Sequence, residues 1–213
     1  MTTRKKTKRT RRGVKAVGQV QGIPGPLVLA TDAAVDHRCF GAGFLATSGH
    51  YGLQGHPYGQ ETSGVHRAAV AELRAVWCAL DHLQSAGIPS SLAIEVRLDS
   101  IHALTFLREW AQGGSRMPDG YLLWRQSGAV PTLERLRQTV ALRSTALTFR
   151  HEQGHVGNPL NEAADTLAKL ALRCSNGLMP PDLPAGLARR YAEQNLVAYL
   201  QELPGSGGSA SST

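Results

Sequence analysis

Four carboxylates and one histidine are the side chains in this 213-residue chain best suited to chemistry. Asp32 and Asp99 each end an apolar run that we predict to be a strand, and Glu72 lies beside the apolar stripe of a predicted helix. Asp165 lies in the second turn of a later helix. Converging carboxylates bind hydrated divalent cations, and two such cations can drive hydrolysis of a phosphodiester. The spacing therefore predicts a metal-dependent hydrolytic site.

His155 lies between two glycines, Gly154 and Gly157, ten residues before Asp165. An imidazole on a glycine-flanked loop suits proton transfer near neutral pH. We therefore place His155 with the four acids.

The same segment permits a different class of enzyme. His151, Glu152 and His155 match the zinc-protease pattern H-E-x-x-H, which requires both histidines on one helical face. Here the residues before His151 alternate as in a strand, and the glycines oppose a helix. A zinc metalloprotease is thus a remote alternative.

A basic run opens the chain and accounts for its net charge of +7. The run contains Arg4, Lys5, Lys6, Lys8, Arg9, Arg11, Arg12 and Lys15. Without these eight, 15 of the 23 basic residues remain against 16 acidic ones. Such a run favours a polyanionic partner. We predict that residues 1–24 form a disordered arm whose basic residues bind nucleic acid.

The bulk composition indicates a globular protein, with 42% hydrophobic and 18% charged residues. No apolar run reaches the roughly 20 residues of a membrane helix. The three scattered cysteines suggest a reducing compartment, so we expect a cytoplasmic protein. We also expect a monomer.

The hydrophobic pattern predicts three strands followed by alternating helices and strands, which favours a mixed α/β sheet with helices on its faces. The predicted strands span 27–32, 39–47, 51–58, 92–98 and 146–151. The predicted helices span 65–84, 100–107, 131–142, 158–173 and 187–202. We assign residues 25–175 to one domain and 176–213 to an extension with a helix and a flexible Gly/Ser tail.

The chain resembles type 1 ribonuclease H over roughly residues 27–173. The resemblance rests on Thr31-Asp32-Ala33, Ala71-Glu72-Leu73, Leu98-Asp99-Ser100 and Gly154-His155-Val156-Gly157-Asn158-Pro159 through to Asp165. It implies a ribonuclease H-like fold, a five-stranded mixed sheet with helices on both faces. It also implies two Mg²⁺ ions, with Mn²⁺ as a substitute, and cleavage of the RNA strand of an RNA–DNA hybrid to leave 5′-phosphate and 3′-hydroxyl ends.

Carried over by the resemblance, Asp32, Glu72 and Asp99 are the principal metal ligands and Asp165 is the fourth. His155 assists attack by water or product release. Arg67 stands where the family often has a phosphate-contacting threonine, and Ser100 is a second expected contact with nucleic acid.

The chain departs from the family where the hybrid is held. Ala33, Ala68 and Ile101 replace a glycine, an asparagine and a glutamine. Strict preference for a hybrid therefore stays open. A nucleic-acid-binding protein that keeps the fold but has lost turnover is an alternative.

Overall fold

The computed structural model describes residues 13–58, 67–125, 127–154, 157–180 and 182–203. Its strands are β1 (Val14–Gln19), β2 (Leu27–Val35), β3 (Cys39–Ala46), β4 (His50–Pro57), β5 (Ile94–Leu98) and β6 (Leu147–His151). Its helices are α1 (Arg67–Ser85), α2 (Ile101–Ala111), α3 (Thr132–Leu142), α4 (Pro159–Ser175) and α5 (Leu183–Glu202).

The strands form one mixed sheet in the order β1-β4-β3-β2-β5-β6. Strands β2, β5 and β6 are parallel, and the other pairings are antiparallel. The expected five strands are thus joined by a sixth, because β1 pairs with the outer side of β4. This corrects the prediction for residues 14–19, which are a strand and not part of a disordered arm. Residues 1–12 lie outside the described part of the chain.

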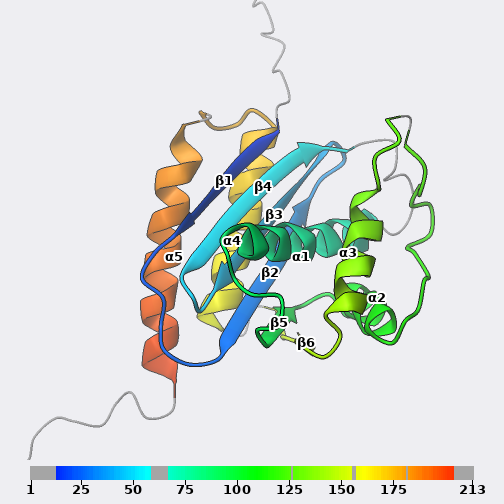
Figure 1. The fold of residues 1–213 in the computed structure, drawn as a ribbon. Coiled ribbons are helices and arrows are strands. Elements are labelled where there is room, and N and C mark those ends of the chain that lie inside the picture. Colours follow the sequence, from blue (N-terminus) through cyan, green and yellow to red (C-terminus); the bar gives the residue numbers. More distant parts are fainter. Residues whose placement is uncertain (1–12, 59–66, 126, 155–156, 181, 204–213) are drawn as a thin grey trace, which may run out of the picture.

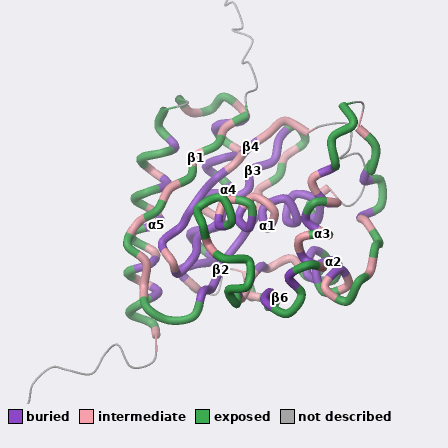
Figure 2. The backbone as a smooth tube through the Cα atoms, in the orientation of Figure 1, coloured by how far each residue is buried: buried purple, intermediate pink, exposed green. Residues whose placement is uncertain are grey.

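Helices cover both faces of the sheet (Figure 1). On one face α1 packs across β2 and β3, and α2 and α3 pack beside it over a core that contains Leu29, Leu73 and Trp110. On the other face α4 crosses β2, β3 and β4, and α5 packs against α4 and β1. Figure 2 shows the result: the central strands are buried, and exposed residues lie on the outer helices and loops. The middle of the sheet is therefore packed between two apolar cores, one on each face.

Two glycines let α4 approach β3 closely. A Cβ added at Gly41 would clash with the backbone of Ala168 and Leu172, and one added at Gly43 with the backbone of Ala164 and Ala168. The absence of a side chain at both glycines therefore allows the backbone of α4 to lie close to β3.

The last helix begins earlier than its sequence pattern predicts, at Leu183 instead of Leu187. Pro184 does not prevent this, since proline is compatible with the first turn of a helix. Ala188, Ala192 and Leu196 of α5 are buried in the core shared with α4. Among the described residues, no helix has the combination of length and apolar character needed to cross a membrane.

Candidate active site

Three of the four predicted carboxylates meet at one point. Asp32, Glu72 and Asp99 each offer an oxygen atom, and these oxygens lie within 4.8 Å of one another. They line a cavity of about 230 Å³. Asp165 lines the same cavity but does not belong to the close group. Of the four predicted carboxylates, three therefore lie close together, and the fourth, Asp165, lies at the rim of the cavity.

Strand register brings the first pair of acids together. Ala30 of β2 lies beside Arg97 of the parallel strand β5, so two residues further on Asp32 is level with Asp99. The strand containing Asp32 continues to Val35, whereas the sequence pattern predicted that it ends at the acid. Glu72 comes from α1, which packs across β2. The acids therefore meet at the carboxyl end of β5, where parallel sheets gather ligands.

A stripe of polar residues on α4 forms another wall of the cavity. Asn161, Asp165 and Lys169 follow one another at four-residue spacing, so they share one face of the helix. The Nζ of Lys169 lies 2.6 Å from Oδ2 of Asp165. Asn158 caps the helix, with its Oδ1 accepting a hydrogen bond from the Leu160 amide at 3.0 Å. Asn161 and Lys169 were not among the predicted site residues, although their spacing from Asp165 could have revealed them.

The close approach of the acids, together with their burial, raises the pKa of Asp32 and of Glu72. Burial, together with the nearby Asp99 carboxylate, raises the pKa of Asp32 to about 7, although the Ala33 amide donates to its Oδ1 at 2.6 Å. Burial and the charges of Asp32 and Asp99 hold the pKa of Glu72 well above its usual range. The protein therefore gathers negative charge at a cost in its own stability.

This cost leads to a prediction for the metal-free protein. In chelator at pH 8, Asp32→Asn should raise the free energy of unfolding by about 2 kcal/mol, because it removes a buried, repelled charge. The folded protein binds the Asp32 proton more tightly than the unfolded chain does. The stabilisation of the variant should therefore shrink as pH falls from 7 towards 4. Urea melts at several pH values measure it, with exposed Asp182→Asn as the control. Equal stability of wild type and Asp32→Asn at pH 8 would contradict the prediction.

The donor set fits divalent cations. Oxygen ligands from several carboxylates are those that Mg²⁺ and Mn²⁺ prefer. Oε2 of Glu72 and Oδ1 of Asn161 are buried and have no hydrogen-bond partner among the described residues. Buried oxygens left without donors, beside two more carboxylates, are what a bound cation would satisfy.

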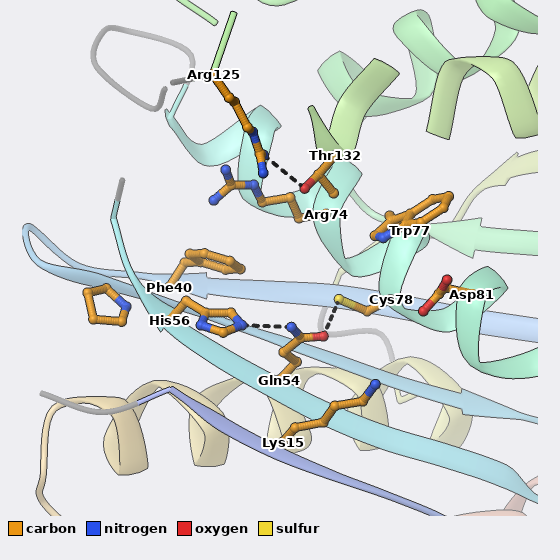
Figure 3. A pocket seen from close by; sticks show the side chains of 11 residues that line it. Lys15, Phe40, Gln54, His56, Arg74, Trp77, Cys78, Asp81, Arg125 and Thr132 are labelled. Carbon is orange, nitrogen blue, oxygen red and sulfur yellow. Dashed lines mark hydrogen bonds between the residues drawn. The ribbon is translucent and has the colours of Figure 1, made fainter. Parts of the chain in front are cut away.

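The other predicted site residues do not line this cavity, or they lie outside the described chain. His155 and the arm residues from Arg4 to Arg12 lie outside the described residues. Arg67 begins α1, with its guanidinium 4.6 Å from the centre of the Tyr58 ring. Ser100 caps α2, where its Oγ accepts a hydrogen bond from the Ala103 amide at 3.2 Å. Lys15 lies in β1 and lines a different cavity, beside α1 (Figure 3).

The structure contradicts the zinc-protease alternative. His151 ends strand β6, and its Nε2 lies 3.0 Å from the backbone oxygen of Asp99. Glu152 pairs with Arg97 at 3.6 Å. The helix that should carry both histidines of the zinc pattern is absent at His151, and α4 begins only at Pro159. The alternative fails because the pattern needs one helical face.

Comparison with known proteins places the chain in a family. The RNase H family model matches residues 25–173, and the chain belongs to the RNase H family. Its fold is accordingly RNase H-like, with the sheet described above. The search of curated proteins found no match.

Solved structures that the chain matches include two of an RNase H1 isolated from compost by a metagenomic approach. One is 22% identical over 70% of this chain and 97% of that chain, with a TM-score of 0.44. The other, in complex with an RNA/DNA hybrid, is 23% identical over 70% and 98% of the two chains, with a TM-score of 0.47. A third is RNase H1 from the halophilic archaeon Halobacterium salinarum NRC-1, 21% identical over 69% and 97%, with a TM-score of 0.41.

Proposed function

We propose that this protein is an endoribonuclease that hydrolyses the RNA strand of RNA–DNA hybrids with two divalent cations, Mg²⁺ or Mn²⁺. The observation that supports it most directly is the meeting of Asp32, Glu72 and Asp99 within 4.8 Å, in a chain of the RNase H family. A protein that only binds nucleic acid would gain nothing from three mutually repelling carboxylates. The catalytically weak alternative is therefore less favoured.

In this proposal the three close acids hold the cations and Asp165 completes the set. Cations bound there would supply an activated water and stabilise the leaving oxygen, giving 5′-phosphate and 3′-hydroxyl products. Asn161 lines the same cavity with an amide that can orient water or a sugar hydroxyl. His155 would accept a proton from the attacking water or assist product release. Arg67 and Ser100 would contact the nucleic-acid backbone.

A cleavage assay tests the proposal. Labelled RNA–DNA hybrid, duplex RNA and duplex DNA are incubated with the protein in Mg²⁺, in Mn²⁺ or in chelator. Cleavage of the hybrid, dependent on metal and leaving a 5′-phosphate, is the expected result. If the wild type cuts none of the three in either metal, the binding-only alternative takes its place.

The ion pair on α4 gives a prediction about metal affinity. Lys169→Met should increase the affinity for Mg²⁺ about threefold, because it removes a positive charge from the cavity and releases Asp165. Lys169→Arg should behave like the wild type. Isothermal titration with Mg²⁺ measures the affinity.

The matched control is Arg189→Met, which breaks an ion pair of the same four-residue spacing on α5. It should leave Mg²⁺ affinity unchanged. Weaker binding of Mg²⁺ by Lys169→Met, or an equal gain in the control, would exclude this role for Lys169.

The arm gives a prediction about substrate binding. Deleting residues 1–12 removes seven basic residues but keeps β1, and so leaves the sheet intact. Binding of a hybrid should weaken, and the slope of log affinity against log salt should flatten by about two or more, since fewer phosphates are neutralised. Fluorescence anisotropy between about 50 and 200 mM salt measures both. An unchanged slope would mean that the arm does not bind the substrate.

A further inference from the structure

Asp99 is the one acid of the cluster whose backbone belongs to no helix or strand. It lies in the two-residue connection between the end of β5 at Leu98 and the start of α2 at Ile101. Asp32 and Glu72, by contrast, lie within β2 and α1. The hydrogen bonds of a strand or a helix hold those two acids, so Asp99 needs other contacts to keep its carboxylate beside them.

Contacts with the end of β6 hold this part of the chain. The Glu152 amide donates to the carbonyl oxygen of Leu98 at 3.0 Å. Nε2 of His151 lies 3.0 Å from the carbonyl oxygen of Asp99. Because a carbonyl oxygen only accepts, the imidazole must carry a proton on Nε2 and donate it. The side chain of His151 thus extends the pairing of β5 and β6 by one residue, to the backbone of Asp99.

Two further contacts hold the end of β6 beside the elements that flank Asp99. Nη2 of Arg108, on α2, donates to the carbonyl oxygen of Phe149 in β6 at 3.2 Å. Nη1 of Arg97, on β5, lies 3.6 Å from Oε2 of Glu152. β5, β6 and α2 therefore form one connected group at an edge of the sheet (Figure 1). The imidazole donates from a strand end that both neighbouring elements hold.

The carboxylate of Asp99 also meets the segment that leaves β6. Gly154, three residues after His151, lines the acidic cavity. A Cβ added at Gly154 would lie 3.1 Å from Oδ2 of Asp99, closer than ordinary van der Waals contact. The φ of Gly154 is not positive, so space and not backbone conformation favours glycine there. One short segment therefore contacts both the backbone and the carboxylate of Asp99.

We propose that His151 is a positioning residue of the cation site: its imidazole N–H holds the backbone of Asp99 where the Asp99 carboxylate meets those of Asp32 and Glu72. His151 does not line the cavity, so it acts on cations only through Asp99. Groups that orient metal ligands from behind commonly change metal affinity by about 10- to 100-fold. The inference rests on the proposed function only as far as the cations, and not on the nucleic acid that is cut.

Titration of Mg²⁺ into the metal-free protein, without nucleic acid, tests the proposal. His151→Phe keeps a ring but removes the donor, whereas His151→Gln keeps an N–H that can reach the same carbonyl oxygen. The control is His37→Phe, at an exposed histidine between β2 and β3 that does not line the cavity. Isothermal titration measures the affinity, and urea melts in chelator verify that each variant is folded.

His151→Phe should bind Mg²⁺ about tenfold more weakly than the wild type. His151→Gln should stay within about threefold of the wild type, because its amide replaces the donor, and His37→Phe should bind like the wild type. Equal affinity of the wild type and His151→Phe, an equal loss in His151→Gln or in the control, or no binding of Mg²⁺ by the wild type overturns the proposal.

Nitrogen-15 NMR of the imidazoles tests the hydrogen bond without a substitution in the measured protein. Spectra of His151→Gln assign the His151 signals by their absence. In the metal-free wild type, Nε2 of His151 should carry a proton. An Nε2 without a proton overturns the proposal, because it could not donate to Asp99.

Cleavage of an RNA–DNA hybrid at increasing Mg²⁺ separates positioning from a direct part in the reaction. In His151→Phe the Mg²⁺ concentration for half the maximal rate should rise about tenfold, and the rate at saturating Mg²⁺ should approach that of the wild type. A lower rate at saturation with an unchanged half-maximal concentration overturns the proposal. If Mg²⁺ binding depends on His151 but the wild type cuts no hybrid, the positioning role stands and the proposed nuclease function fails.

Discussion

Asp99→Asn should reduce cleavage of an RNA–DNA hybrid by about 1000-fold or more, while the protein stays folded. The substitution keeps the shape of the side chain but removes the charge that, with Asp32 and Glu72, forms the close acidic cluster. Single-turnover cleavage of labelled hybrid in Mg²⁺ measures the rate. Circular dichroism and a urea melt verify the fold.

Asp182→Asn is the matched control for this prediction. The residue is an exposed aspartate before α5, its side chain caps no helix, and it does not line the acidic cavity. Its rate should equal that of the wild type. If Asp99→Asn cleaves within tenfold of the wild-type rate, the acid cluster is not the catalytic centre and the proposed mechanism is wrong.

Gly43→Ala should destabilise the protein by about 3 kcal/mol, at the upper end of what overpacking costs. The added Cβ would meet the backbone of Ala164 and Ala168 in α4, and backbone cannot move aside as a flexible side chain can. Gly43 is also the cross-strand partner of Asp32, and Asp165 lies on α4 between the two residues that it would strike. The substitution should therefore move Asp165 away from the other acids and lower cleavage as well as stability.

Gly186→Ala is a control for which we expect the opposite effect on stability. This glycine lies exposed in α5, and a Cβ added there meets nothing within 4 Å. Replacing a helical glycine with alanine should stabilise the protein by about 0.5–1 kcal/mol. Urea melts measure both variants. A Gly43→Ala protein as stable as the wild type would show that α4 does not rest on β3 as closely as described.

The order of helices and strands could be predicted because it depends on local patterns. The apolar stripe predicted a helix over 65–84, and α1 spans Arg67–Ser85. Asn158 and Pro159 marked the start of α4 through capping, which acts within one turn. Such signals need no knowledge of distant parts of the chain.

Strand β1 could not be found in this way. Its residues follow a charged run, and they become a strand only by pairing with β4, whose residues lie 31 to 41 positions further along the chain. The same pairing places Lys15 beside α1 and not in a free arm. An edge strand such as β1 forms through hydrogen bonds to its partner strand. The sequence of Val14–Gln19 alone therefore does not predict it.

The sequence by itself determined which side chains can do chemistry, since four carboxylates at the ends or faces of elements already indicate a cation site. Only the tertiary structure decided how they are grouped. Strand register sets Asp32 level with Asp99, and Gly43 lets α4 come close enough for Asp165 to reach the rim, where Lys169 pairs with it. These relations join residues far apart in the chain, so packing decides them and no local pattern records them.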